Sequence, residues 1–231
     1  MSAVAPLAWR PDAVVFDMDG LMLDSERAIT DCMTRAAAEA GHDLPPGLWL
    51  EMVGTGDAAC RAMLAERLGD AATDALLEHA GALYAEVVDA GVPHRPGLLA
   101  LLDWLEQRRI PRAVATSTRR TLALRKLRRA GLLARFDAIC TSSDVAHPKP
   151  APDVYLLAAA QLGVAPARCV VLEDSPTGVR AALAAGMTPV QVPDLVVPDD
   201  AVRALRHRIV ESLGDAQRLL EACMELDRRP A

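Results

Sequence analysis

The sequence has few aromatic residues and no long apolar run. Aromatic residues make up 3 % of the 231-residue chain, although 52 % of the chain is hydrophobic. Alanine, leucine and valine must therefore fill most of the core, which suits helices and buried parallel strands. No apolar run approaches the ~20 residues that a transmembrane helix needs. We therefore expect no membrane partner.

The chain also lacks an excess of basic residues. It has 25 Lys and Arg against 31 Asp and Glu, and its formal net charge is −6. Nonspecific binding to a phosphate backbone needs clustered cations, so nucleic acid is not an expected partner. Nothing in the sequence indicates an obligate protein partner.

Cysteine is scarce as well. The 5 cysteines are widely spaced, at positions 32, 60, 140, 169 and 223, and form none of the pairs typical of zinc or redox motifs. The first ten residues lack the basic start and apolar stretch of a secretory signal. These features predict reduced core cysteines and a cytoplasmic location.

Short runs of β-forming residues recur along the chain, and helical patterns follow most of them. This alternation predicts a doubly wound α/β fold around a parallel sheet. The expected strands are Ala13–Phe16, Ala113–Ala115, Ala138–Cys140, Cys169–Leu172 and Pro189–Val192. The expected helices of this layer are Leu98–Gln107, Arg119–Ala130, Pro152–Leu162, Thr177–Ala185 and Ala216–Leu226.

One connection breaks this rhythm. The chain from Phe16 to Ala113 is far longer than an ordinary βα loop, and two stretches within it have apolar residues at helical spacing. We therefore expect an α-helical cap domain at residues 25–95, inserted into a core made of residues 1–24 and 96–231. The linkers at Leu23–Asp24 and Pro93–Gly97 are candidate hinges for closure of this cap.

Polar residues collect where the predicted strands end, which is where open α/β sheets bind ligands. They are Asp17 and Asp19 after the first strand, Thr116, Ser117 and Thr118 after the second, Thr141 to Asp144 after the third, and Glu173, Asp174 and Ser175 after the fourth. Lys149 lies in a proline-stiffened loop between the third and fourth strands. We expect these residues to face one crevice.

Carboxylates that converge in this way repel one another and need a cation. Oxygen ligands without a partner His or Cys favour Mg²⁺, which binds through carboxylates and substrate phosphate. A lysine and hydroxyl groups beside the ion would complete a phosphate site. Each of these residues alone is more often a turn, cap or surface residue, so the prediction depends on their occurring together.

Residues 54–59, with the sequence GTGDAA, match a dinucleotide-binding pattern. The pattern alone is weak, and it lies inside the helical insertion instead of after the first strand. We interpret it as a loop between cap helices, with glycines that let the backbone approach a substrate.

Four segments in this order resemble the motifs of the haloacid dehalogenase-like phosphohydrolases, in the subgroup with a helical cap after the first motif and a Rossmann-like core. They are VVFDMDGLMLDSE, VATST, HPKPAPDVY and VVLEDSPTGVRAALAAGM. The resemblance covers nearly the whole chain. It implies that Asp17 is a nucleophile that forms an aspartyl-phosphate, and that Asp19 is the general acid and then the general base.

The resemblance also implies the ligands of a metal and a phosphate. Mg²⁺ would be held by Asp17, by the backbone carbonyl of Asp19 and by Asp174, with Glu173 bound to it directly or one step removed. Thr116 and Ser117 would bind phosphoryl oxygens. Lys149 would orient Asp17 and neutralise charge on the transferring group.

The expected activity is a phosphatase acting on a small phosphomonoester, such as a sugar or nucleoside monophosphate. The segment FDMDGLMLDSER is similar to the start of pseudouridine-5′-phosphatase-type enzymes. Glu26 and Arg27, where the chain enters the cap, either touch a leaving group or are exposed helix charges.

Two alternatives remain. A β-phosphoglucomutase-like isomerase shares the motifs, but the His typical of it after the first motif, and the Lys or Arg of its cap loop, are missing here. A receiver-type phosphoacceptor domain combines an acidic cluster, a hydroxyl and a lysine with Mg²⁺, but it is roughly half as long and has no helical insertion.

Overall fold

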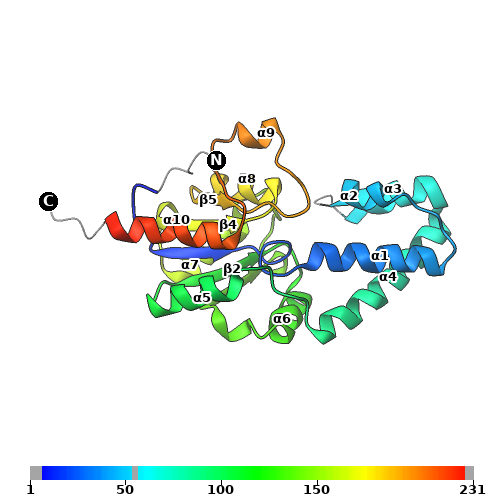
Figure 1. The fold of residues 1–231 in the computed structure, drawn as a ribbon, viewed down its shortest axis with the longest axis horizontal. Coiled ribbons are helices and arrows are strands. Elements are labelled where there is room, and N and C mark those ends of the chain that lie inside the picture. Colours follow the sequence, from blue (N-terminus) through cyan, green and yellow to red (C-terminus); the bar gives the residue numbers. More distant parts are fainter. Residues whose placement is uncertain (1–6, 54–56, 227–231) are drawn as a thin grey trace.

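The computed structural model describes residues 7–53 and 57–226. Within these residues one sheet has all neighbouring strands parallel, in the order β3-β2-β1-β4-β5-β6 (Figure 1). The strands are β1 (Ala13–Phe16), β2 (Arg112–Thr116), β3 (Ala138–Thr141), β4 (Cys169–Glu173), β5 (Thr188–Gln191) and β6 (Arg208–Ile209). The doubly wound α/β fold is therefore confirmed.

Ten α-helices accompany the sheet in the described part of the chain. They are α1 (Ser25–Glu39), α2 (Pro46–Met52), α3 (Asp57–Leu68), α4 (Asp70–Ala90), α5 (Leu98–Gln107), α6 (Arg120–Arg129), α7 (Asp153–Leu162), α8 (Pro176–Ala184), α9 (Asp200–Arg203) and α10 (Leu213–Leu226). None of them is both long enough and apolar enough to cross a lipid bilayer.

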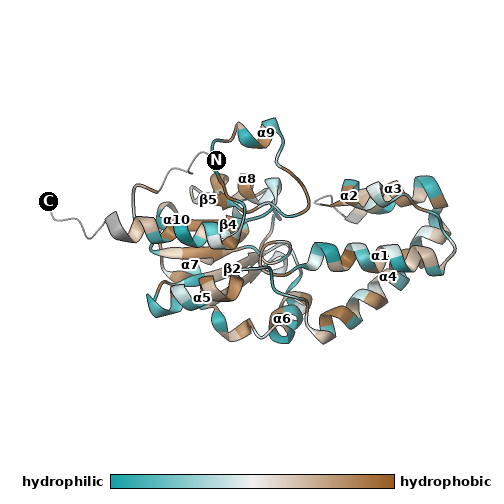
Figure 2. Ribbon diagram, viewed as in Figure 1, coloured by the Kyte–Doolittle hydropathy of each residue, from teal (hydrophilic) through white to brown (hydrophobic). Residues whose placement is uncertain are grey.

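The central strands are apolar on both faces because helices cover both. Val14 and Phe16 of β1 face a cluster shared with α5, α6 and α10, whereas Ala13 and Val15 face a cluster shared with α7 and α8. Successive side chains of a strand point to opposite faces, so a continuous apolar run fits a sheet buried on both sides. Figure 2 shows the strands largely in the hydrophobic colours.

The helices between β1 and β2 have a separate apolar cluster. Cys32 and Ala36 of α1, Trp49 of α2, and Leu76 and Leu83 of α4 are among its buried members. Figure 1 shows α1 to α4 standing to one side of the sheet. The C-terminal end of α4 and the segment after it also pack in the core beneath the sheet, because Val88 of α4 and Val92 just beyond it belong to the cluster around α5 and α6. That residues 25–95 form a separate closing domain stays a prediction.

The two connections to these helices run side by side. The Asp24 amide donates to the Pro93 carbonyl over 2.8 Å, and the Arg95 amide donates to the Met22 carbonyl over 2.8 Å. Leu23 and His94 form an antiparallel bridge between them. The chain therefore leaves and re-enters the core at nearly the same point.

The sequence predicted the five longer strands, and their bounds differ from the observed ones by at most one residue. It missed β6 and α9, which are 2 and 4 residues long, too short to give a periodic signal. Cys32, Cys140, Cys169 and Cys223 are buried, as expected, whereas Cys60 is only partly buried. Residues 54–56 of the GTGDAA segment lie outside the described residues, and its last three residues begin α3 instead of belonging to the predicted loop.

Candidate active site

A cluster of carboxylates lies where the strand order reverses. Asp17 follows β1, Glu173 ends β4, and these two strands pair with Phe16 opposite Leu172. Carboxylate oxygens of Asp17, Glu173 and Asp174 lie within 4.8 Å of one another. Open α/β sheets bind ligands at such a switch point, because the connections from the two strands diverge there. The structure therefore brings these three predicted residues together.

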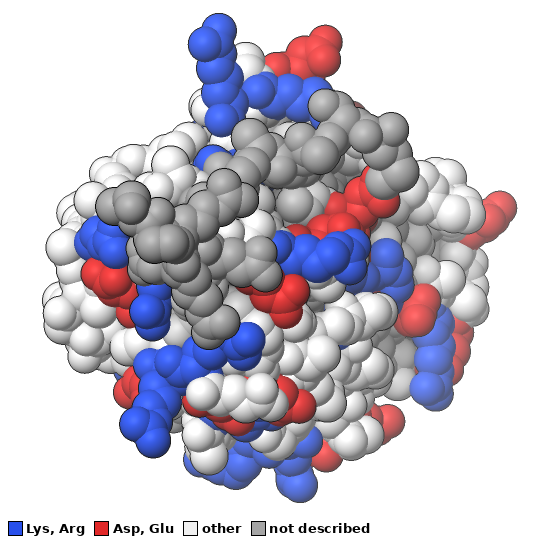
Figure 3. Space-filling model, turned by 60° about the vertical axis from the view of Figure 1, so that its left-hand side comes forward, with Lys and Arg blue, Asp and Glu red and all other residues white. Residues whose placement is uncertain are grey.

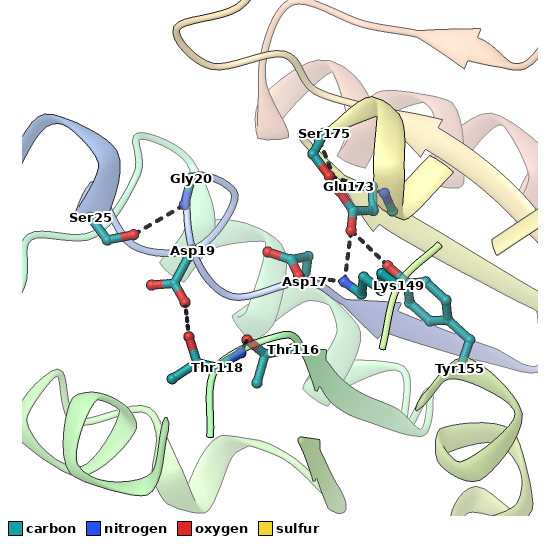
Figure 4. Close-up of polar contacts among 11 residues, drawn as sticks. Asp17, Asp19, Gly20, Ser25, Thr116, Thr118, Lys149, Tyr155, Glu173 and Ser175 are labelled. Carbon is teal, nitrogen blue, oxygen red and sulfur yellow. Dashed lines mark hydrogen bonds and ion pairs between the residues drawn. The ribbon is translucent and has the colours of Figure 1, made fainter. Parts of the chain in front are cut away.

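Lys149 is the cation at the centre of this cluster. Its Nζ donates to Asp17 Oδ1 over 2.6 Å and to Glu173 Oε1 over 2.8 Å, and its side chain is only 3 % exposed (Figure 4). The ammonium also lies 4.7 Å from the ring centroid of Tyr155. Burial alone would lower the pKa of Lys149, but the charges of Asp17 and Glu173 raise it well above the usual value. Lys149 is therefore protonated in the folded protein.

Glu173 anchors Lys149 to the sheet. Its Oε1 also accepts from the Tyr155 hydroxyl over 2.8 Å, and its Oε2 accepts from the amide and hydroxyl of Ser175 at 2.8 and 3.0 Å. Burial acts to raise the pKa of Glu173, but Lys149 and these hydrogen bonds lower it below the usual value. Glu173 is thus a charged carboxylate with both oxygens already engaged by protein donors.

The other two carboxylates have too little positive charge around them. Burial raises the pKa of Asp17 to about 7, and the charge of Glu173 acts in the same direction against Lys149. Burial, followed by the charges of Glu173 and Asp17, raises the pKa of Asp174 well above the usual value. An all-oxygen cluster with excess negative charge fits a hard divalent cation.

A tight turn brings the loop after β1 against Asp174. Gly20 has φ +81°, and a Cβ atom placed on it would lie 2.3 Å from Asp174 Oδ2. A side chain at this position would be both strained and in collision. Glycine therefore lets Asp17 and Asp19 approach the end of β4.

Asp19 points to the opposite side of the turn. Its Oδ2 accepts from Thr118 Oγ1 over 2.6 Å, and its Oδ1 accepts from Lys126 Nζ over 2.7 Å. Figure 4 shows the carboxylate directed toward Thr118. Burial acts to raise the pKa of Asp19, but Lys126 and then the Thr118 hydroxyl lower it below the usual value.

The two predicted phosphate-binding hydroxyls differ in exposure. Thr116 ends β2, is 1 % exposed, and accepts from the Thr118 amide through Oγ1 over 3.0 Å. Ser117 is exposed just beyond the strand. Both lie at the carboxyl edge of the sheet next to β1.

The end of β3 does not join this cluster, contrary to expectation. Asp144 accepts from the amide and hydroxyl of Thr141 in a capping box and forms a salt bridge with Arg120. The Arg120 hydrogen bond leads the effects that lower the pKa of Asp144 to about 2. Its role here is to close a short 3₁₀ helix.

Sequence analysis missed two buried contributors. Lys126 lies in a basic stretch, but it is three residues after Ala123 and adjacent to Leu127, both buried, so helical spacing places it on the apolar face. Tyr155 belongs to the apolar pattern of α7, which by itself indicates only a place in the core. Its hydroxyl contact to Glu173 needs the three-dimensional arrangement to be seen.

Figure 3 shows one face of the molecule, on which acidic and basic side chains are interspersed and no large patch of one sign forms. Buried charges gather at the carboxyl edge of the sheet, where Asp17 and Glu173 pair with Lys149 and Asp174 lies close to both carboxylates.

Comparisons with known proteins agree with this arrangement. A family model described as haloacid dehalogenase-like hydrolase matches residues 11–186. The phosphorylated carbohydrates phosphatase of Thermotoga maritima is 32 % identical over 214 residues, which cover 91 % of each chain. The fructose-1-phosphate phosphatase of Escherichia coli is 34 % identical over 182 residues, 78 % of this chain and 95 % of the other.

A solved structure extends the similarity to three dimensions. It is a HAD family hydrolase from Deinococcus radiodurans with bound phosphate and sodium, 33 % identical to this chain, with a TM-score of 0.78. The match covers 97 % of this chain and 100 % of that one. The likeness therefore includes the helices inserted after β1 as well as the sheet.

Proposed function

This chain belongs to the haloacid dehalogenase-like hydrolases and is a phosphatase of small phosphomonoesters, and we propose that it works through an aspartyl-phosphate at Asp17 with Mg²⁺ as cofactor. The observation that carries the proposal is the buried group of Asp17, Lys149, Glu173 and Asp174, with Asp19 two residues after the nucleophile.

In the first step, a carboxylate oxygen of Asp17 attacks the phosphorus of the substrate. A bond forms between Asp17 and phosphorus while the bond from phosphorus to the leaving oxygen breaks. Asp19 must carry a proton for this step, although Lys126 and Thr118 lower its pKa. It gives that proton to the leaving oxygen, so an alcohol leaves instead of an alkoxide. Lys149 holds Asp17 in place through the 2.6 Å hydrogen bond and offsets charge on the phosphoryl group.

In the second step, water attacks the phosphorus of the aspartyl-phosphate. Asp19, now a carboxylate, takes a proton from the water, and the bond between phosphorus and Asp17 breaks to release phosphate. Thr116 and Ser117 at the end of β2 would donate to phosphoryl oxygens in both steps. One acid thus serves as donor and then as acceptor.

The carboxylates of Asp17 and Asp174 and the backbone carbonyl of Asp19 would hold Mg²⁺. The ion, when bound, would supply positive charge beside the transferring phosphoryl group. Glu173 would not bind the ion directly, because both its oxygens already accept hydrogen bonds from Lys149, Tyr155 and Ser175. It would instead hold Lys149 beside the ion's ligand Asp17.

Names of relatives favour a phosphorylated sugar as substrate. The Thermotoga maritima protein is named for phosphorylated carbohydrates and the Escherichia coli protein for fructose 1-phosphate. We expect residues 25–95 to close over such a substrate and exclude bulk water. Solution scattering with and without Mg²⁺ and a phosphate mimic tests this; identical profiles would contradict large-scale closure.

The function is tested by measuring phosphate release from sugar and nucleoside monophosphates, in Mg²⁺ or in EDTA, while sugar-phosphate isomers are followed in parallel. Release that needs Mg²⁺ supports the proposal and ranks the substrates. Interconversion of β-glucose 1-phosphate with little release would instead make the protein a phosphosugar mutase. A persistent aspartyl-phosphate without turnover would indicate a phosphoacceptor domain.

A further inference from the structure

We propose that Lys126 is a positioning residue that holds the Asp19 carboxylate in the direction needed for proton transfer to and from the substrate. This inference rests on the proposed function, because it assigns Asp19 the acid and base role. The carrying observation is an ion pair between Lys126 Nζ and Asp19 Oδ1 at 2.7 Å.

The position of Lys126 on α6 is unusual for a lysine. The helix is strongly basic, and its neighbours Arg125 and Arg129 reach outward to Asp89 of α4. Lys126 instead turns inward on the same side as Ala123 and Leu127, and the residue is 2 % exposed. Burying an ammonium group is costly unless it is paired and hydrogen-bonded.

An apolar residue at position 126 would satisfy the packing of α6 without that cost. Replacing a buried ion pair by apolar groups of similar volume is often neutral or stabilising, so fold stability alone does not explain a lysine here. The carboxylate that Lys126 meets is Asp19, the proposed acid and base. The ammonium group of Lys126 therefore contacts the carboxylate whose orientation determines whether a proton can be transferred.

Lys126 and Thr118 hold the two oxygens of Asp19 separately. Lys126 binds Oδ1 at 2.7 Å and Thr118 Oγ1 binds Oδ2 at 2.6 Å, so rotation of the carboxylate would break both contacts. Ser25 is a further side-chain donor to this carboxylate. A carboxylate has about four lone-pair directions, so about one remains for a substrate or water. The donors fix the plane of the group without using all of its capacity to react.

The same lysine contacts the helices inserted after β1. Its Nζ lies 4.9 Å from the ring centroid of Tyr84 on α4, within range of a cation–π interaction. Tyr84 packs against both the sheet-side cluster and the cluster of α1 to α4. Lys126 is thus supported from α4 while it supports Asp19.

The test compares Lys126→Met with Arg125→Met in the full chain. Both remove a cation from the contact between α4 and α6, but Arg125 bonds to Asp89 and does not reach Asp19. Each variant is assayed for kcat/KM on an alkyl sugar phosphate and on p-nitrophenyl phosphate. The alkyl alcohol needs protonation to leave, whereas p-nitrophenolate leaves readily without it.

We expect Lys126→Met to lower kcat/KM for the sugar phosphate about 100-fold, a typical size for impaired general acid catalysis, with little change in KM. The value for p-nitrophenyl phosphate should fall less than about threefold, and Arg125→Met should change neither by more than that. The effect of Lys126→Met should disappear when it is combined with Asp19→Asn, because the lysine acts through that carboxylate.

An equal loss on both substrates, no loss on either, or an undiminished loss in the Asp19→Asn background would overturn the proposal. Thr118→Val provides a second route if Lys126→Met does not fold, because it removes the other donor to Asp19 without removing a charge, and it should show the same leaving-group dependence. Failure of the proposed function would look different, since the wild-type protein would then release no phosphate.

Discussion

Lys149 donates a hydrogen bond to Asp17 over 2.6 Å, although 132 residues separate the two in the chain. The sheet creates this meeting, because β1 carries Asp17 to the same edge at which the loop before α7 presents the lysine. Glu173 then fixes the far side of the ammonium at 2.8 Å. The proposed nucleophile is thus held by a cation that is itself held by the core.

Asp17→Asn should abolish phosphate release and leave the fold intact. The amide keeps the volume of the side chain but is no nucleophile, so turnover should fall by at least about 10³-fold. Circular dichroism and thermal unfolding check the fold. Asp74→Asn, at a side chain 61 % exposed, is the matched control and should keep wild-type activity. Turnover by Asp17→Asn at the wild-type rate would show that Asp17 is not the nucleophile.

Gly178→Ala should destabilise the protein even though the glycine lies in a helix. Helix propensity alone would favour alanine by about 1 kcal/mol. A Cβ atom at this position, however, would lie 1.6 Å from Glu173 Oε1, so Glu173 must move and carry Lys149 with it. We expect a loss of about 1–3 kcal/mol in unfolding free energy, together with reduced turnover.

Gly81→Ala is the control for this change. Gly81 lies within α4 and has no atom near the added Cβ position, so the substitution should stabilise the protein by about 0.5–1 kcal/mol. Urea unfolding measures both variants. A Gly178→Ala protein as stable and active as Gly81→Ala would show that the Glu173 carboxylate is not held as tightly as its contacts indicate.

Stabilisation by Mg²⁺ should be greater at high pH than at low pH. The folded-state pKa of Asp17 is raised from 3.8 to about 7, so its contribution to stability is present below about pH 4 and is lost as the pH rises through 7. A metal ion and protons compete for the carboxylates of Asp17 and Asp174, so the ion binds more tightly at high pH, where fewer protons are bound.

The measurement is the thermal midpoint in Mg²⁺ minus that in EDTA, at about pH 5 and about pH 8. Titrating groups outside the site change both thermal midpoints alike, so their effect cancels in this difference. Asp174→Asn should reduce the increment at the higher pH. An increment that is equal at the two pH values would argue against metal binding by Asp17 and Asp174.

Asp194→Asn should loosen the junction between the sheet and the inserted helices. Asp194, on the loop after β5, has a side chain 2 % exposed; it accepts a hydrogen bond from Arg27 at 2.6 Å and forms a salt bridge with Arg95 at 2.8 Å. Arg27 lies near the start of the insertion and Arg95 at its end, so the Asp194 carboxylate contacts both segments that connect the insertion to the core. Removing its charge should cost about 1–3 kcal/mol of unfolding free energy.

Urea unfolding tests this prediction, with Asp103→Asn as control because that carboxylate is 60 % exposed in its pair with Arg135. An exposed pair contributes about 0–1 kcal/mol. Equal effects of the two substitutions would show that the Asp194 contacts are no stronger than surface pairs.

Sequence patterns located the strands and the carboxylates because both depend on local order. A buried parallel strand is a continuous apolar run, and its first polar residue marks the edge of the sheet, as at Asp17 and Glu173. The contacts of Lys126 and Asp194 could not be found in this way. Each pairs with residues far along the chain, and the single-residue pattern of a lysine or aspartate is the same whether it faces water or a partner.

The order of the strands also had to come from the structure. Apolar runs do not say that β1 lies between β2 and β4, and that placement decides which loops share the site. The end of β3 illustrates the difference. Asp144 has the same sequence setting as Asp174, a polar residue after a strand, but its own Thr141 and the neighbouring Arg120 engage it in a cap.

The bridge between Leu23 and His94 makes the inserted helices resemble a long excursion from a hairpin. Two antiparallel strands at that spacing can be joined by a turn of about two residues, so a chain could pass directly from one to the other, although Val88 and Val92 would then be missing from the core. Such a truncated protein would also lose Tyr84 from above Lys126 and Asp89 from beside Arg125. The chain could therefore bypass the insertion, because its two ends lie next to each other. Its removal would nevertheless expose Lys126, the residue that contacts Asp19, to solvent.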